Sequence, residues 1–263
     1  MAPPPTTPAT STGSASPPAS SSANLIKLAK TLQFGWFVGH VFVLLGVFFY
    51  FLSALRFNTG SSWARFWYRE SYFAVIVTYG IVLYRSHRAS TPTFRRLIRD
   101  DNFQYLLIAL LWFISKPLFF TTLPFAIYSA FHVLTYLRTN LLPALGQASS
   151  APLPTKIQTF VDNYNDKCTS LVANLELVLF VRLFLRALTF RRGSWITLLI
   201  YGSFVRLRLE GSVYSRQALR NWGVRIDSLM AHPKVPPAVK GYWEKAKTMA
   251  QQGAVPASSA KPE

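Results

Sequence analysis

The chain has 263 residues, of which 51% are apolar and 15% aromatic, and its formal net charge is +18. Soluble globular domains rarely combine so apolar a composition with so basic a balance, whereas membrane proteins place Lys and Arg at the borders of apolar segments. Because the basic residues here border apolar segments, the charge argues against nucleic acid as a partner and favours anionic lipid headgroups or an acidic protein.

The first predicted elements are a polar tail and a long apolar helix. Residues 1–23 are rich in Pro, Ser and Thr and predict a disordered cytosolic tail, not a cleavable signal peptide. From Thr31 to Leu55 the chain runs for 25 residues without Lys, Arg, Asp or Glu. At ~1.5 Å rise per residue this is roughly 37 Å of helix, longer than a bilayer core of ~30 Å. We therefore expect a full membrane span here that serves as its own insertion signal.

Small and polar residues within the apolar segments predict helix packing. Gly35 and Gly39 form a Gly-x-x-x-Gly step and Gly46 lies one heptad further on, so this stripe allows another helix to approach closely. That helix belongs either to this chain or to a partner protein. His40 and His132 lie in separate apolar segments without a neighbouring carboxylate, which favours hydrogen bonds between helices over a metal or acid–base site.

The later apolar segments are expected in pairs. A loop of aromatic residues and Arg at 63–69 has the composition of a membrane interface, and the basic stretch 85–101 places the N-terminus in the cytosol by the positive-inside rule. Within that stretch, Asp100 and Asp101 predict the N-cap of the next helix. A cytosolic loop with a polar helical lead-in is expected at 138–170. The expected pairs are 31–55 with 71–84, 102–115 with 117–137, and 171–190 with 193–205.

Several of these segments are short for a bilayer, and one carries charges. Residues 71–84 give only ~21 Å of helix, and Glu176, Arg182 and Arg186 interrupt residues 171–190. A central Arg costs ~2.5–3.5 kcal/mol on insertion scales, so this segment is expected to lie shallow or to face protein and water. Pairs that do not all reach the far leaflet would displace lipid mainly on one side, as a wedge does. The number of full spans stays open.

Beyond Arg208 the pattern changes to two basic amphipathic helices with a period of 3.6 residues. Such helices bind anionic membrane surfaces with Trp at headgroup depth, but they also pack on other helices, and both readings stay open. The expected membrane-binding residues are Leu219, Trp222, Ile226, Leu229 and Met230 in the first helix, and Val239, Tyr242, Trp243 and Met249 in the second. The expected contacts to anionic lipid or to a karyopherin are Arg216, Arg220, Arg225, Lys240, Lys245 and Lys247.

Catalytic motifs are missing from this sequence. It contains no phosphate-binding Gly-rich loop and no His-Glu-x-x-His, and the single cysteine, Cys168, excludes an internal disulfide. We therefore expect no enzyme activity, no cofactor and no metal site. A small intramembrane enzyme or channel with His40, His132 and Glu176 as its polar interior is the least favoured alternative.

Several of these stretches together resemble the transmembrane protein 33 family, including its fungal pore-membrane and endoplasmic-reticulum branch. The similarity covers roughly residues 28–245. It is carried by Thr31-Leu-Gln-Phe-Gly-Trp-Phe-Val-Gly-His40, Asp100-Asp-Asn-Phe-Gln-Tyr-Leu-Leu107, Lys116-Pro117, Pro124, His132 with Tyr136, Asn174-Leu-Glu176 and Phe204-Val-Arg-Leu-Arg208. The resemblance implies residence in the endoplasmic reticulum and nuclear envelope, association with reticulon-type shaping proteins, and a contribution to nuclear pore assembly or distribution. It also implies that the C-terminal helices bind curved membrane and a karyopherin.

The sequence thus predicts an all-α, polytopic membrane protein with both ends in the cytosol. Its expected parts are a disordered tail (1–23), a helical membrane domain (24–210), an amphipathic region (211–252) and a second disordered tail (253–263). The expected function is to shape or sense curvature of endoplasmic-reticulum and pore membrane. The alternative is a membrane-anchored adaptor that recruits a karyopherin or a reticulon without bending membrane. The oligomeric state stays open.

Overall fold

The computed structural model describes residues 21–88, 92–148, 150–190, 193–233 and 235–254, and these residues are almost entirely helical, with no strand among them. The all-α prediction is therefore confirmed. The helices are α1 (Ser21–Ala29), α2 (Leu32–Leu55), α3 (Ser62–His87), α4 (Phe94–Ile98), α5 (Asp101–Ile114), α6 (Phe119–Tyr136), a π-helical turn η1 (Leu137–Leu141), α7 (Leu142–Ala144), α8 (Pro152–Leu188), α9 (Ser194–Gly211), α10 (Val213–Met230) and α11 (Pro237–Ala254). Most of the predicted tails, 1–20 and 255–263, lies outside the described residues.

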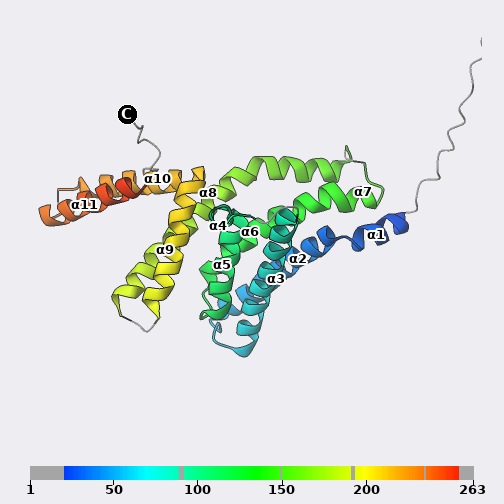
Figure 1. The fold of residues 1–263 in the computed structure, drawn as a ribbon, viewed down its shortest axis with the longest axis horizontal. Helices are drawn as coiled ribbons and strands as arrows, with labels where there is room; N and C mark the ends of the chain where they lie inside the picture. Colours follow the sequence, from blue (N-terminus) through cyan, green and yellow to red (C-terminus); the bar gives the residue numbers. More distant parts are fainter. Residues whose placement is uncertain (1–20, 89–91, 149, 191–192, 234, 255–263) are drawn as a thin grey trace, which may run out of the picture.

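Six of these helices form the body of the molecule, a cyclic bundle. Each packs on two neighbours in the order α5, α3, α2, α6, α8, α9 and back to α5. The pairs α2–α3 and α8–α9 pack as hairpins, as predicted. Helices α5 and α6 follow each other in sequence but pack mainly on different neighbours, α3 and α9 for the first and α2 and α8 for the second. In Figure 1, α2, α5 and α8 end at the lower end of the bundle, where α3, α6 and α9 begin.

The core of the bundle is unusually rich in tyrosine. The ring of Tyr72 is buried between α3 and α6, and its hydroxyl donates a hydrogen bond of 2.8 Å to Thr121 Oγ1. A tyrosine buried in this way contributes apolar area and still satisfies its polar end, which fits a domain whose surroundings offer no water. The fully or nearly buried tyrosines are Tyr50, Tyr68, Tyr72, Tyr79, Tyr105, Tyr136 and Tyr201.

The outer surface of the bundle is apolar. Exposed large apolar residues follow every helix of the ring, which in a soluble protein would be a liability but in a bilayer faces lipid. They include Phe42, Leu45, Phe48, Phe73, Leu110, Phe120, Val181, Phe184, Leu185, Ile196 and Leu199. Two helical stretches, Leu32–Leu55 and Phe119–Ala144, are long and apolar enough to cross a membrane, and Asp101–Ile114 is a shorter apolar helix.

Two predicted boundaries were wrong. The expected interfacial loop at 63–69 forms the first two turns of α3, since Ser61 caps the helix by accepting a hydrogen bond from the Ala64 backbone N–H at 3.1 Å. Helix α3 consequently has 26 residues, against the 14 predicted for this segment. The expected loop at 138–170 is also much shorter, because η1 and α7 continue α6, and α8 already begins at Pro152, a residue favoured at a first helical position.

Candidate membrane-facing surface of the C-terminal hairpin

Helices α10 and α11 are mounted on the bundle through the end of α9. A single extended residue, Ser212, separates α9 from α10 and caps α10, because its hydroxyl accepts a hydrogen bond from the Ser215 backbone N–H at 3.3 Å. This one residue changes the direction of the chain. Figure 1 shows α9 running along the bundle, whereas α10 and α11 extend sideways from its upper end, where α10 packs on α8.

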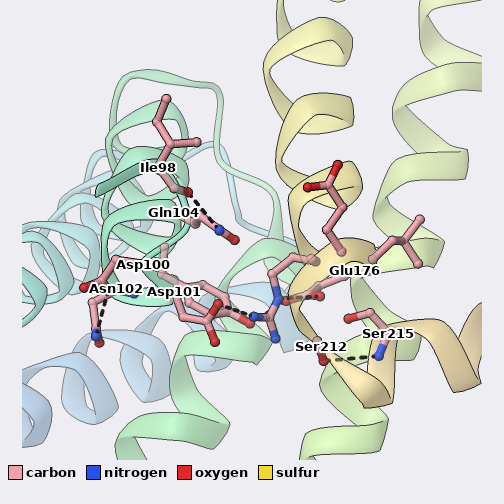
Figure 2. Close-up of polar contacts among 12 residues, drawn as sticks. Ile98, Asp100, Asp101, Asn102, Gln104, Glu176, Ser212 and Ser215 are labelled. Atoms are coloured by element: carbon pink, nitrogen blue, oxygen red, sulfur yellow. Dashed lines mark hydrogen bonds and ion pairs between the residues drawn. The ribbon is translucent and has the colours of Figure 1, made fainter. Parts of the chain in front are cut away.

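A polar cluster centred on the buried Arg208 holds the end of α9 in place. Arg208, 6% exposed, forms an ion pair of 3.0 Å with Asp101 at the start of α5 and one of 3.7 Å with Glu176 in α8. Its guanidinium also lies 5.2 Å from the ring centre of Tyr105. Figure 2 shows the labelled Asp101 and Glu176 on either side of the cluster, with Ser212 and Ser215 just below. Helices α5, α8 and α9 therefore meet at one guanidinium.

The second partner of the cluster is the carboxylate of Glu176. This side chain is 3% exposed and accepts a 2.6 Å hydrogen bond from the Tyr105 hydroxyl, which is 3.1 Å from the Tyr128 hydroxyl of α6. A buried carboxylate is tolerated when paired and hydrogen-bonded in this way. Glu176 is therefore a packing group, which accounts for one charge in the interrupted segment 171–190. The other two, Arg182 and Arg186, are exposed within the last two turns of α8, where long side chains reach the membrane interface.

The inner face of α10 packs on the bundle. Ser215 and Ala218 are buried, and Leu219 and Trp222 pack against the core. The Trp222 indole N–H donates a 2.9 Å hydrogen bond to Asn174 Oδ1 in α8. The N-terminal half of the predicted apolar stripe of α10, which contains Leu219 and Trp222, therefore packs within the protein.

Two further polar contacts fix α10. The Tyr214 hydroxyl donates a 2.7 Å hydrogen bond to Asp166 in α8, and this contact raises the pKa of Tyr214. Arg216 donates to the backbone carbonyls of Leu209 and Glu210, at 3.2 and 2.9 Å, and so caps the C-terminal end of α9. Arg216 is thus engaged within the protein, whereas Arg220 and Arg225 are exposed.

The C-terminal half of α10 and most of α11 do not pack on the bundle. Ile226 and Met230 are half-buried and Leu229 is 65% exposed. On α11, Val239, Tyr242 and Met249 are 44, 74 and 69% exposed. These three residues follow a helical spacing of three and seven, so they form one face, which we call the α11 stripe.

Helix α11 is held to α10 through one carboxylate. Asp227 of α10 accepts a 2.7 Å hydrogen bond from the Trp243 indole N–H and another of 2.7 Å from the Lys247 ammonium. The Lys247 ammonium and the Trp243 N–H hold the pKa of Asp227 below its ordinary value of 3.8, and Asp227 raises the pKa of Lys247. Trp243 and Lys247 therefore face α10, while Lys245 is exposed and Lys240 is partly exposed.

The predicted glycine stripe divides between two environments. A Cβ on Gly39 would collide with the Thr78 side chain of α3, and one on Gly46 would lie 2.8 Å from Ser71 Cβ, so both glycines permit the close contact of α2 with α3. A Cβ on Gly35 would meet nothing within 4 Å. The close helix approach seen here lies within this chain.

The two histidines meet each other between α2 and α6. Their ring centres are 4.7 Å apart, His40 Nδ1 lies 2.9 Å from Ser129 Oγ, and Trp36 packs on both rings. Glu176 instead contacts Tyr105 and Arg208, so the structure does not unite His40, His132 and Glu176 in one site. Within the described residues, no three His, Cys, Asp or Glu side chains form a group that could hold a metal ion.

Sequence reasoning missed the polar partners that decide which face of each helix is covered. Asn174 and Asp166 belong to α8 and accept hydrogen bonds from the side of α10 that faces the bundle. Asp227 lies on the polar face of α10, where a carboxylate is ordinarily solvated. A weak signal existed for Asp227, since Asp227 and Glu244 are the two acids among six cations from Arg216 to Lys245 in the printed sequence. Its partners in α11 lie across a turn, and the turn geometry was not predictable.

Comparison with known proteins identifies close relatives over most of the chain. The family model described as Transmembrane protein 33/Nucleoporin POM33 matches residues 15–256. The chain is 39% identical to "Nucleoporin POM33" of Chaetomium thermophilum, an alignment covering 87% of this chain and 88% of the relative. It is 33% identical to "Pore membrane protein of 33 kDa" of Saccharomyces cerevisiae, covering 81 and 80%, and 30% identical to "Pore and endoplasmic reticulum protein of 33 kDa" of the same yeast, covering 81 and 87%. No solved structure matches the chain.

Proposed function

Because this chain belongs to the Transmembrane protein 33/Nucleoporin POM33 family, we propose that it is a non-enzymatic membrane protein of the endoplasmic reticulum and nuclear envelope that supports nuclear pore complex assembly or distribution. The names of its relatives, which join the words nucleoporin, pore membrane and endoplasmic reticulum, support this location. The proposed mechanism is that the protein shapes or senses membrane curvature.

The observation that carries this mechanism is the exposure of the α11 stripe. If the bundle helices cross the bilayer, α10 and α11, which run across the bundle end in Figure 1, lie parallel to the membrane surface. The exposed apolar stripe can then enter the headgroup layer of one leaflet while the exposed Lys245 of the same helix meets anionic lipid. Insertion into one leaflet only favours curved membrane.

The bundle supports the same mechanism. Helix α5 has 14 residues, about 21 Å of helix against the ~30 Å of a bilayer core. At the opposite extreme α8 has 37 residues, and its polar first half runs across the same bundle end as α10 and α11 in Figure 1. Protein volume is therefore concentrated at one end, which acts as a wedge in one leaflet.

We place this broad end in the cytosol. The end of α3 and helix α4 lie at this end of the bundle, as do the described helices nearest to both chain termini. These two segments and the residues that directly follow them carry the exposed cations Arg85, Arg88, Arg95, Arg96 and Arg99. Positive residues beside membrane spans favour the cytosolic side. Both termini of the chain would then be cytosolic.

The experiment uses the full-length protein reconstituted into vesicles. In a Cys168→Ser background, an environment-sensitive fluorophore is attached to Ala246→Cys, which lies between Tyr242 and Met249 on the face of the α11 stripe. Emission is compared between small and large vesicles, with and without anionic lipid. The proposal expects a blue shift that is larger in small vesicles. Introducing Tyr242→Asp with Met249→Asp is expected to abolish the shift. Gly241→Asp with Thr248→Asp adds the same two carboxylates outside the stripe and is expected to preserve it.

Two results would contradict curvature sensing. The first is an emission spectrum that does not depend on vesicle size. The second is a shift that survives Tyr242→Asp with Met249→Asp, because the stripe would then not be the element in contact with lipid.

A specific observation also favours the adaptor function. Arg220, Arg225 and Lys245 are exposed and take part in no ion pair within the described residues, so they are available to an acidic partner such as a karyopherin or a reticulon-type protein. Changing all three to Glu is expected to abolish capture of a purified candidate partner. If the fluorophore shift persists in that variant, recruitment and membrane contact are separate properties.

A further inference from the structure

A groove unrelated to the C-terminal hairpin lies at the opposite end of the bundle, between α3 and α5. It has a volume of about 590 Å³, and its lining residues are Ser62, Arg65, Phe66, Arg69, Glu70, Phe73 and Phe113. Six of the seven belong to α3, at the helical spacing of one face, and the opposite face of the same turns packs into the tyrosine core through Tyr68 and Tyr72. The groove therefore opens outward, toward the membrane surroundings.

The polar lining of this groove has a definite charge pattern. The guanidinium groups of Arg65 and Arg69 lie one helical turn apart and are exposed, and neither takes part in an ion pair within the described part of the chain. Arg65 donates a 3.1 Å hydrogen bond to Ser62 Oγ, which directs its guanidinium along the groove edge. Two neighbouring guanidinium groups at an interface are suited to bind one phosphate.

The carboxylate of Glu70 adds a negative group to the same groove. Glu70 is half-buried, and one of its carboxyl oxygens has no hydrogen-bond partner among the described residues. That oxygen lies against α2 at Gly46, which has no side chain to displace it. Glu70 also lines the groove and takes part in no ion pair within the described residues, so a cationic donor in the groove would balance its charge.

We propose that this groove binds a phospholipid that carries a primary ammonium beside its phosphate, as phosphatidylethanolamine and phosphatidylserine do. Arg65 and Arg69 hold the phosphate, Glu70 accepts from the ammonium, and Phe73 with Phe113 contacts the start of an acyl chain. The charge pattern of the groove, two cations beside one anion, is complementary to such a headgroup and not to a bare phosphate monoester.

The depth of the groove suits this ligand. Ser62 begins α3 beside the exposed aromatic residues Phe57, Trp63 and Phe66, a composition typical of the membrane interface. From Arg69 to Phe73 the helix rises about 6 Å, from headgroup depth to acyl-chain depth. Polar and apolar groups thus follow one another along α3 in the order in which they do along a phospholipid.

The test is native mass spectrometry of the full-length protein in mild detergent. Phosphatidylethanolamine, phosphatidylserine, phosphatidylcholine and phosphatidic acid are added in turn at equal concentration. The wild type is expected to retain the first two preferentially. Arg65→Gln with Arg69→Gln is expected to reduce their retention by about tenfold or more. Glu70→Gln is expected to remove the preference over phosphatidic acid without removing binding.

A second groove on the same helix supplies the control. It has a volume of about 360 Å³ near the other end of α3, where Arg85 is the one charged residue in its lining. Arg85→Gln is expected to leave retention unchanged, and melting temperatures of all variants confirm that they fold. The proposal is overturned if Arg65→Gln with Arg69→Gln retains lipid like the wild type, if Arg85→Gln loses as much, or if phosphatidic acid or phosphatidylcholine is preferred.

Discussion

Helices α10 and α11 have 18 residues each and carry similar amphipathic patterns, but the bundle covers only one of them. Trp222 of α10 packs on the core and donates to Asn174 in α8. Trp243 of α11 donates to Asp227 instead, and the stripe beside it stays exposed. Tryptophan therefore anchors α10 to the bundle, whereas in α11 it hydrogen-bonds to α10 and leaves the neighbouring apolar face exposed.

An amphipathic pattern thus indicates that one face of a helix is apolar, but it does not indicate whether protein or membrane covers that face. The hydrogen-bond partners of each helix determine which of its faces is covered by protein. Helix α10 finds hydrogen-bond acceptors on α8, namely Asn174 and Asp166, whereas the contacts described for α11 converge on Asp227. We therefore expect substitutions in α10 to change folding and substitutions in α11 to change membrane contact.

The largest effect is expected at the mount of α10. Arg208→Ala leaves the buried carboxylate of Glu176 without its cation, and breaking a buried pair in this way costs about 3–5 kcal/mol. Thermal unfolding of the purified protein in detergent measures the loss. Arg206→Ala, on the same helix and in an exposed pair with Glu210, is the matched control and is expected to change stability by less than about 0.5 kcal/mol. Equal melting temperatures for the two variants would show that the cluster does not hold α9.

A smaller loss of stability is expected on the inner face of α10. Trp222→Ala removes packing against the core and the hydrogen bond to Asn174. We expect it to lower the free energy of unfolding by about 2 kcal/mol at this half-buried site. Trp222→Phe keeps most of the ring and is expected to lose about 1 kcal/mol. Tyr242→Ala, in the α11 stripe, is the comparison and should leave the melting temperature unchanged. If Trp222→Ala melted like Tyr242→Ala, the two helices would not differ in the way described.

Much of the fold followed from the sequence because apolar runs and capping residues are local signals. The first span was predicted at 31–55 and α2 occupies Leu32–Leu55, and Asp100 caps α5 as expected, accepting from the Asn102 backbone N–H at 2.8 Å. The start of α3 was missed because Arg and aromatic residues were read as an interface, although nothing in that stretch disfavours a helix. Hydropathy reports the environment of a segment and not its helix boundaries.

The candidate surface was less predictable, since long-range pairing decided it. Leu219 and Val239 both lie on predicted apolar stripes, but one packs on the core and the other is 44% exposed. Nothing local distinguishes them. The same holds for Glu176 and Arg208, which belong to different helices and became recognisable as a pair only when the ring of helices brought α8 beside α9.

The link between α10 and α11 is expected to break with little effect on the bundle. Asp227→Asn removes the charge that Lys247 and Trp243 share, so α11 should separate from α10 while α10 stays on α8. Hydrogen–deuterium exchange is expected to rise in residues 237–249 and to stay unchanged in residues 213–226. Glu244→Gln, another acid in the same hairpin, is the control. Faster exchange throughout α10 would mean that the two helices form one cooperative unit.

The smallest effect is expected from pH, and its direction follows from the same pair. The Lys247 ammonium and the Trp243 N–H lower the pKa of Asp227. The Asp227 carboxylate therefore contributes fully to the stability of the α10–α11 contact above its ordinary pKa of 3.8, and this stability is lost as the pH falls through the lowered pKa. Asp227 raises the pKa of Lys247. The Lys247 ammonium therefore contributes fully to the stability of the same contact below its ordinary pKa of 10.5, and this stability is lost as the pH rises through the raised pKa. Spin labels on Ser228→Cys and Thr248→Cys, in a Cys168→Ser background, should therefore report one short distance across this whole interval and a longer one beyond either end. The same labels on Asp227→Asn should report the longer distance throughout. A wild-type distance that changed near neutral pH would instead mean that another group sets the position of α11.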